Sequence, residues 1–396
     1  MNQWQECKLG DVAEITSSKR IFYSDYIHSG IPFWRSKEVI EQFNRHSIST
    51  SLFISHDKYN EIKEKYGVPK TDDILLTSVG TLGIPYLVKD NDCFYFKDGN
   101  LTWIRNINKQ LLLPKFFYIW LSSQTGRDSL REITIGSTQE ALTIVGLKGL
   151  DILLPPLSEQ RAIATVLSSL DDKIDLLHRQ NKTLEAMAET LFRQWFIEEA
   201  DERWEEKPLS FYGNVICGKT PSKKVASYFN GDIPFIKIPD MHGNVFILDT
   251  ADTLTNAGKQ SQLNKTLPPK SICVSCIATV GLVSLNAKES QTNQQINSIL
   301  PYEGYYRYFL YLFMRSSYDL LHAMASGGTA TPNLNTGDFS KIPTIYPDKS
   351  VLENFHKIVE PLFDKILSNQ FNVQTLCTLR DTLLPKLMSG EVRVAV

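Results

Sequence analysis

Two stretches of the chain carry apolar residues at alternating spacings of four and three. The first stretch follows Pro155 and Pro156, continues to Trp195 and has Asn181 as its polar member. This spacing predicts a helix with a coiled-coil seam rather than a simple amphipathic helix, and Ser158 is the expected N-cap. The expected seam positions are Ile163, Leu167, Leu170, Ile174, Leu177, Asn181, Leu184, Ala188, Leu191 and Trp195.

The second stretch repeats the seam 192 residues later. We expect Pro361 and Pro385 to kink or end this helix, which leaves residues 362–384 as its regular part. If the two helices pack antiparallel with Ile163 beside Leu387, Asn181 lies opposite Asn369, a pairing that can fix register. The alternative is that both amides face solvent. The expected seam positions are Phe355, Val359, Leu362, Ile366, Asn369, Val373, Leu376, Arg380, Leu383 and Leu387.

The segments before the two helical stretches are rich in short strand signals. Runs of β-branched residues at 74–79 and 272–280 are bounded by Gly, Pro and Asp, which predicts strands. Amphipathic stretches at 114–121 and 306–315 predict helices between them. The predicted fold class is therefore mixed α/β (α+β) with an irregular sheet.

The chain also contains an internal repeat. KLGDVAEITSSKR (8–20) returns as FYGNVICGKTPSKK (211–224), and GIPFWRSKE (30–38) returns as GDIPFIKIPD (231–240), in the same order. Two pseudo-repeated modules are therefore predicted, each followed by a long helix. The expected boundaries are 1–155 for the first module, 156–206 for its helical segment, 207–348 for the second module and 349–396 for its helical segment.

Composition limits where a nucleic acid could bind. The 396 residues include 42 Lys plus Arg and 44 Asp plus Glu, so any phosphate-binding surface must be a local patch. The acid excess lies in residues 156–206, which suits protein docking better than DNA contact. The chain shows no secretory signal, no bilayer-spanning stretch and no disulfide framework, and we therefore expect a cytoplasmic protein.

Two short motifs suggest chemistry. GNVICGKT, residues 213–220, matches the phosphate-loop pattern, but Pro221 follows it and no core strand precedes it. A nucleotide-hydrolysing enzyme built around Lys219 stays as an alternative. Cys273 and Cys276 form one C-x-x-C in a strand pattern, where residues three apart face opposite sides, so we expect reduced cysteines and no metal site. We expect no catalytic residue in this chain.

Basic residues recur at repeat-equivalent loops. Lys and Arg among Ser, Thr and Gly suit contacts to phosphates and base edges, whereas the alternative is an ordinary solvated surface. The duplication favours DNA contact. The candidate DNA-binding residues are Lys19, Arg20, Arg35, Lys37, Lys219, Lys223, Lys224, Lys237, Thr138, Gln139 and Thr329.

These features together resemble the specificity (S) subunit of a type I restriction-modification system. The resemblance covers essentially the whole chain and is carried by LPPLSEQRAIATVLSSLDDKIDLL (154–177), LRDTLLPKLMSGEVRV (379–394), and GKTPSKK with IPFIK in the second module. The sequence departs from the family pattern at TSSKR in the first module and at YPDKSVLENF before the second helix. These departures weaken the transfer of individual contact residues to those loops.

The resemblance implies a fold and a set of partners. The modules would be two target-recognition domains separated by an antiparallel pair of helical spacers. Double-stranded DNA, two methyltransferase (M) subunits and restriction (R) subunits would be the partners. The chain itself would bind no cofactor and catalyse nothing, while its partners would use S-adenosylmethionine, ATP and Mg. A coiled-coil adaptor without DNA contact is a further alternative.

Overall fold

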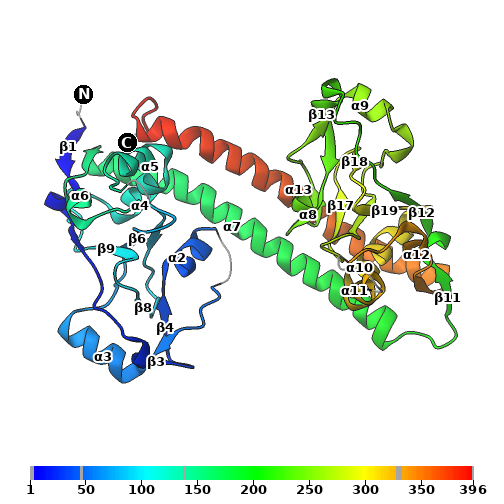
Figure 1. Cartoon of the computed structure of the whole chain (residues 1–396), viewed down its shortest axis with the longest axis horizontal. Helices are drawn as coiled ribbons and strands as arrows, with labels where there is room; N and C mark the ends of the chain where they lie inside the picture. The colour runs from blue at the N-terminus through cyan, green and yellow to red at the C-terminus, as the bar shows by residue number, and fades with distance from the viewer. Residues whose placement is uncertain (1–3, 45–47, 137–139, 327–331, 395–396) are drawn as a thin grey trace. The chain divides into compact units, whose positions relative to one another are not determined.

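The computed structural model describes residues 4–44, 48–136, 140–326 and 332–394, which form two compact units. The first unit combines Met1–Lys173 with Cys377–Val396, and the second unit is Ile174–Leu376. Two long helices, α7 (Leu157–Arg193) and α13 (Lys349–Met388), contribute residues to both units (Figure 1). No helix within the described ranges combines the length and hydropathy that a membrane crossing requires.

The described residues of the first unit form ten short strands. Their bounds are β1 Gln5–Lys8, β2 Glu14–Thr16, β3 Tyr26–Ile27, β4 Ile31–Trp34, β5 Phe53–Ile54, β6 Ile74–Thr77, β7 Pro85–Leu87, β8 Tyr95–Phe96, β9 Leu101–Arg105 and β10 Asp151–Leu154 among the described residues. One sheet has the order β2-β9-β6-β7, a second has the order β3-β5-β4-β8, and β1 pairs with β10. All neighbours are antiparallel except β4 and β8.

The second unit repeats this plan. Its described strands are β11 Glu205–Pro208, β12 Gly213–Cys217, β13 Phe229–Ile236, β14 Phe246–Ile247, β15 Thr253–Leu254, β16 Ile272–Ser275, β17 Val283–Asn286, β18 Gln291–Thr292, β19 Ile296–Pro301 and β20 Pro343–Tyr346. The sheet β12-β19-β16-β17-β14 corresponds to the first sheet of the other unit with one strand added. The sheet β15-β13-β18 and the pair β11-β20 complete the unit.

Short helices connect and cover the sheets. In the described residues they are α1 Leu9–Val12, α2 Ser36–Phe43, α3 His56–Lys65, α4 Pro114–Ser122, α5 Gln124–Glu132, α6 Ile144–Lys148, α8 Ile238–Met241, α9 Asn256–Gln260, α10 Arg307–Ser316, α11 Tyr318–Ala325 and α12 Thr336–Ser340. The predicted helices at 114–121 and 306–315 are confirmed as α4 and α10. Both bury their apolar faces in the core of their unit.

The duplication extends to individual hydrogen bonds. After β6, the Gly83 N–H donates to the Thr77 carbonyl at 2.8 Å, and after β16 the Gly281 N–H donates to the Ser275 carbonyl at 2.9 Å. Both strands are shorter than the apolar runs predicted, because the backbone adopts positive φ after each of them. The φ angle is 81° at Gly80 and 64° at the equivalent Ala278.

Helix α7 confirms the predicted seam but begins one residue before Ser158. The Gln160 N–H donates to the Pro156 carbonyl at 2.9 Å, so the first helical turn already closes on Pro156 and Ser158 is not the N-cap. All ten predicted seam positions are buried or half-buried.

The two long helices run antiparallel in each unit. In the first unit Ile163 and Leu387 belong to one core cluster, and the Arg380 guanidinium donates to Asp171 at 3.0 Å. In the second unit the rings of Phe192 and Phe355 lie 6.4 Å apart. The predicted register is therefore correct on both sides.

Helix α13 is continuous through Pro361 and Pro385, so the expectation that one of them could end the helix was wrong. Each proline removes one backbone hydrogen bond and costs about 3 kcal/mol in a helix interior. Both prolines are exposed, as are Lys357 and Asp381, the residues whose carbonyls would otherwise accept the missing bonds. Apolar residues in the flanking turns, such as the fully buried Phe363, offset the cost by about 2 kcal/mol each.

A buried carboxylate joins three distant segments of the first unit. Glu159, near the start of α7, receives a bidentate ion pair from Arg393 near the C-terminus, with 2.6 Å between Nη2 and Oε2. The indole N–H of Trp4 donates to the same Oε2 at 3.2 Å. In the second unit Val351 stands at the repeat position of Glu159, and the indole N–H of the equivalent Trp204 is buried without a partner in the described residues.

Asn181 and Asn369 meet in the seam of the second unit, as predicted. The Asn369 amide donates to Asn181 Oδ1 at 2.8 Å and to Gln180 Oε1 at 2.9 Å. Asn369 is fully buried. The amide donor of Asn369 is satisfied in this register, whereas its Oδ1 is buried without a partner among the described residues. A slip of one helix would also remove the partners of the donor and place the buried amide against an apolar side chain.

We predict that Asn181→Leu weakens the helix pair and that Asn181→Leu/Asn369→Leu restores much of the loss. The single change leaves the buried Asn369 amide short of a partner, at about 1–3 kcal/mol, whereas the double change gives an apolar seam. Hydrogen exchange of the α7 amides near residue 181 measures the local opening free energy.

Ser368→Leu, next to Asn369 on an exposed position, is the matched control and should leave this exchange unchanged. Strictly additive losses in a cycle of Asn181→Leu and Asn369→Leu would contradict a direct interaction between the two amides.

Candidate nucleic-acid interface

The two basic loops predicted from the repeat have the same local structure. Lys19 and Arg20 follow strand β2, and Lys223 and Lys224 follow strand β12. Each pair precedes a short 3-10 helix, Tyr23–Asp25 in the first unit and Ala226–Tyr228 in the second. All four basic side chains are exposed.

Four of the candidate lysines are electrostatically available. Among the residues that the structure describes, Lys19, Lys219, Lys223 and Lys224 form no ion pair with a carboxylate. The ammonium of Lys19 lies 5.1 Å from the centre of the Tyr66 ring, a cation–π contact that fixes its position without neutralising it. These side chains can meet a phosphate without first leaving an acidic partner.

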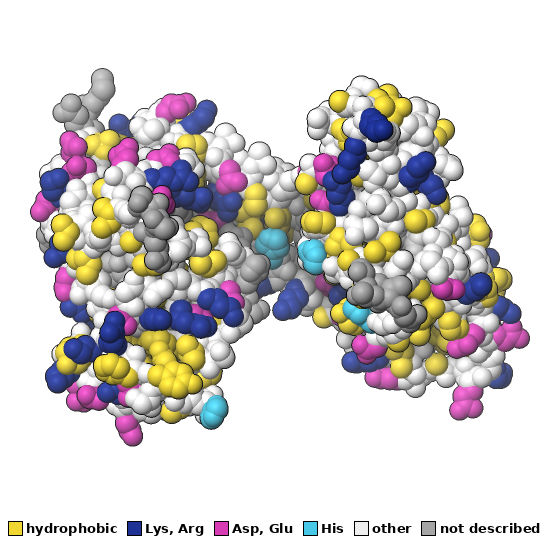
Figure 2. Space-filling view, in the orientation of Figure 1, with side chains coloured by type: hydrophobic (Ala, Val, Ile, Leu, Met, Phe, Trp, Pro, Cys, Tyr) yellow, Lys and Arg dark blue, Asp and Glu magenta, His cyan; other side chains and the backbone are white. Residues whose placement is uncertain are grey.

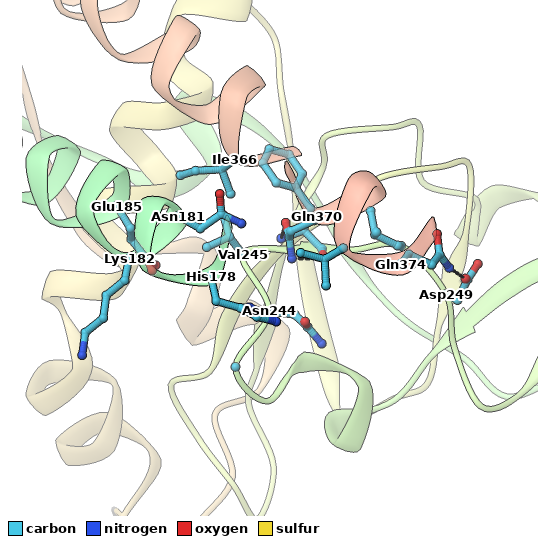
Figure 3. A pocket seen from close by; sticks show the side chains of 14 residues that line it. His178, Asn181, Lys182, Glu185, Asn244, Val245, Asp249, Ile366, Gln370 and Gln374 are labelled. Atoms are coloured by element: carbon cyan, nitrogen blue, oxygen red, sulfur yellow. Dashed lines mark hydrogen bonds between the residues drawn. The ribbon is translucent and has the colours of Figure 1, made fainter. Parts of the chain in front are cut away.

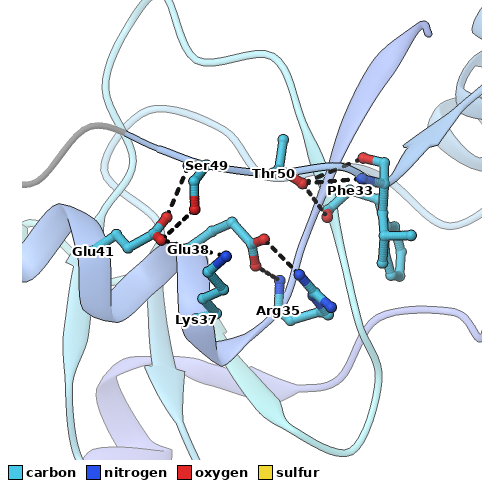
Figure 4. Close-up of polar contacts among 8 residues, drawn as sticks. Phe33, Arg35, Lys37, Glu38, Glu41, Ser49 and Thr50 are labelled. Atoms are coloured by element: carbon cyan, nitrogen blue, oxygen red, sulfur yellow. Dashed lines mark hydrogen bonds and ion pairs between the residues drawn. The ribbon is translucent and has the colours of Figure 1, made fainter. Parts of the chain in front are cut away.

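Four other candidates are already paired with acids. Arg20 donates to Asp98 at 2.9 Å, and Lys37 lies 3.6 Å from Glu41. Arg35 donates to the fully buried Glu38 at 3.0 Å (Figure 4). Lys237 pairs with Asp252. A phosphate must compete with these carboxylates, so their net attraction for DNA is lower.

Arg35 and Lys237 also have equivalent structural roles. The Arg35 N–H donates to Glu38 Oε2 at 2.7 Å, and the Lys237 N–H donates to Asp240 Oδ2 at 2.8 Å. In both units an acid three residues later caps the start of a helix, α2 or α8. The repeat signal at these positions therefore reflects helix capping as well as any contact with DNA.

The Arg35 loop is tied further by hydroxyl groups. Ser49 donates through its backbone N–H to Glu41 at 2.9 Å, and its hydroxyl bonds the same carboxylate, which holds the pKa of Glu41 below its ordinary value (Figure 4). Thr50 donates to the Phe33 carbonyl at 3.3 Å. Three further candidates, Thr138, Gln139 and Thr329, lie outside the described residues.

The phosphate-loop motif does not have phosphate-loop geometry. Residues Gly213–Cys217 form strand β12 itself, and Thr220 does not open a helix, since the next helical turn is the 3-10 helix Ala226–Tyr228. The amides that would hold a phosphate are occupied, since Gly218 N–H donates to Ile296 O at 3.0 Å and Lys219 N–H to Thr292 O at 2.9 Å. A Cβ at Gly218 would lie 2.1 Å from a backbone oxygen, so close packing explains this glycine. The arrangement contradicts the nucleotide-binding alternative.

The two cysteines of the C-x-x-C sequence are buried in the second unit. Burial raises the pKa of both the Cys273 and the Cys276 thiol to about 12, so both stay protonated at neutral pH. Within the described ranges, no group of three or more His, Cys, Asp or Glu side chains is arranged to hold a metal ion.

The second unit also has a cleft that sequence patterns did not reveal. It measures about 540 Å³ and lies between α7, α13 and the loop that enters β14 (Figure 3). Gln370 on α13 receives the Phe246 N–H and donates to the Phe246 carbonyl, both at 3.2 Å. This pair of bonds attaches the first residue of β14 to the helix, with the same donor and acceptor that a neighbouring strand would use. A lone Gln gives no sequence signal for such a contact.

Most of the chain matches one known protein family. The family of the type I restriction modification DNA specificity domain matches residues 1–186 and 201–374. The matched ranges cover most of both modules and of both long helices.

Two relatives match along nearly the whole chain. The type I restriction enzyme HindI specificity subunit of Haemophilus influenzae is 33% identical over 99% of this chain and 100% of its own length. The type I restriction enzyme MjaIX specificity subunit of Methanocaldococcus jannaschii is 28% identical over 99% of this chain and 94% of its own length.

A solved structure shows the same fold. The type I restriction-modification S subunit from M. genitalium superposes with a TM-score of 0.66 at 17% identity, covering 97% of this chain and 96% of that one. With the duplicated modules and the antiparallel long helices, these comparisons show that the chain belongs to the type I restriction-modification specificity family, as a non-catalytic specificity (S) subunit.

Proposed function

We propose that this subunit reads a bipartite, asymmetric DNA target, with one half-site for each module. The observation that supports this proposal is the pair of equivalent loops, in which Lys19 in one unit and Lys223 with Lys224 in the other have no acidic partner in the described parts of the chain. Because the modules share a fold but differ in sequence, the two half-sites should differ in sequence too.

The long helices are the proposed docking surface for partner subunits. Residues 156–206 contain six basic and twelve acidic side chains, and six of those acids follow α7, at residues 198–206. Helix α7 itself has six acidic and five basic side chains and so no positive excess to attract DNA, and a protein surface is the better partner. Two methyltransferase subunits would dock on α7, α13 and the modules, and restriction subunits would join that complex. Adenine methylation with S-adenosylmethionine and cleavage with ATP and Mg would be performed by these partners, in the cytoplasm where the DNA lies.

A coiled-coil adaptor without DNA contact is the remaining alternative. It has the same helices but predicts no salt-sensitive DNA binding when the partners are present. The free lysines of the loops favour the DNA-reading subunit, because an adaptor has no need to keep them away from carboxylates.

Replacing Lys223 and Lys224 by Ala should weaken binding of the assembled methyltransferase complex to all DNA sequences. If each lysine neutralises one phosphate, the slope of log K against log salt should fall by about 0.9 for each residue lost. Affinity measured over a range of salt concentrations gives this slope.

Lys341→Ala removes an exposed positive charge from the same unit outside the loop and serves as the control. An unchanged salt slope in the Lys223→Ala/Lys224→Ala variant would show that these lysines do not contact DNA phosphates.

Module exchange provides a second prediction. Joining residues 1–155 to a different second module should change one half of the target and leave the other half as it was, because each module has its own sheets and core cluster. Methylation-aware sequencing of DNA from cells that express the chimera reports the motif. A chimera that altered both halves would show that the modules read DNA jointly.

A further inference from the structure

The loop that follows Lys19 and Arg20 presents large apolar side chains to solvent. Tyr23 is 91% exposed and Phe22 is 63% exposed, and Ile27 adds to the same surface. Figure 2 shows apolar side chains together over the part of the first unit where Figure 1 labels β3, with Lys and Arg side chains beside them. Consecutive aromatic side chains that are exposed to water are unfavourable, and exposed apolar patches of this kind commonly mark binding sites.

This loop is held in place by its own contacts. The Phe22 N–H donates to Asp25 Oδ2 at 3.0 Å, and the Lys19 N–H donates to the Tyr95 hydroxyl at 2.7 Å. The ring of Tyr23 meets the ring of Tyr26 edge to face, with 6.2 Å between centroids. The aromatic side chains are therefore presented from a fixed backbone, and binding through them would cost little conformational entropy.

Basic side chains lie beside the exposed rings, among them Arg20, which is paired with Asp98. Lys19 and Arg20 precede them directly in the chain, and Lys19 and Lys65 both lie over the Tyr66 ring, at 5.1 Å and 5.4 Å. Aromatic rings interleaved with basic side chains are typical of surfaces that stack on nucleic-acid bases while the charges track the backbone.

The second module lacks this feature although its loop has the same shape. After Lys223 and Lys224, its 3-10 helix carries Ala226 and Ser227 at the exposed positions. The fold of the loop therefore does not require Phe22 and Tyr23. The aromatic pair is an addition specific to the first module.

We propose that Phe22 and Tyr23 form an aromatic wedge that stacks against or partly separates a base step in the half-site read by the first module. This inference rests on the proposed function. Aromatic wedges of this kind unstack a step and kink the duplex, and the nearby basic residues hold the phosphates of the deformed strand. The second module then binds its half-site without such a deformation, so the two halves of the target are read by different physical means.

The test uses the full chain assembled with its methyltransferase subunits, and a DNA duplex that contains the sequence motif that this complex methylates. We expect Phe22→Ala/Tyr23→Ala to weaken binding about tenfold and to leave the salt slope unchanged, because no charge is lost. Tyr23→Trp keeps a stacking surface and should retain wild-type affinity. Tyr302→Ala removes a tyrosine that is 65% exposed in the second unit and should have no effect.

A second measurement reports the wedge directly. 2-Aminopurine placed in the first half-site, at positions other than the methylated adenine, should brighten on binding of the wild-type complex and stay quenched with the Ala variant. The same probe in the second half-site should respond equally to both complexes. Module exchange defines which half-site is the first.

Three outcomes would overturn the wedge. If the wild-type complex binds with sequence specificity and the Ala variant matches it in affinity and fluorescence, the wedge is wrong and the proposed function stands. If the Ala variant fails to assemble with the methyltransferase subunits, the rings are a protein-docking surface instead. If the wild-type complex shows no sequence-specific, salt-sensitive binding, the proposed function fails and the wedge fails with it.

Discussion

Packing of the two long helices against each module is the interaction on which the rest of the structure depends. The core of the first unit includes Ile163 and Leu167 of α7 together with Leu387 and Met388 of α13. The core of the second unit includes Phe192 of α7 with residues of α13 such as Phe355. Neither module buries its apolar surface alone: the first needs the distant C-terminal end of α13, whereas the second packs on the parts of α7 and α13 that directly flank it in the sequence.

This dependence explains which helix features the sequence could predict. Side chains that are buried at regular intervals along a helix leave a regular pattern of apolar residues in the sequence. The seam, the antiparallel register and the meeting of Asn181 with Asn369 could therefore be predicted from the spacing of these residues. The continuity of α13 did not follow. Proline in an isolated helix is disruptive, but Pro361 and Pro385 lie on the solvent side of a helix whose opposite face is buried, and tertiary packing decides the outcome.

The candidate interface was predictable only in part for a related reason. A count of Lys and Arg in loops finds where positive charge is but does not show which acid lies beside it. Arg35 and Lys237 stand at repeat-equivalent positions because both start a helix capped by an acid three residues on. The free lysines and the exposed ring of Tyr23 became distinguishable only once ion pairs and side-chain exposure were known.

The composition of the first unit has a consequence for how the protein is made. That unit includes Cys377–Val396, and Glu159 forms its ion pair with Arg393. On the ribosome the second unit, which ends at Leu376, can therefore complete its core while the first module still waits for the last turns of α13. The module that is synthesised first is thus the one that finishes folding last. Its exposed apolar surface must stay free of aggregation while the second module is translated. A chaperone that holds exposed apolar surface would act on the earliest part of the chain, for the longest time.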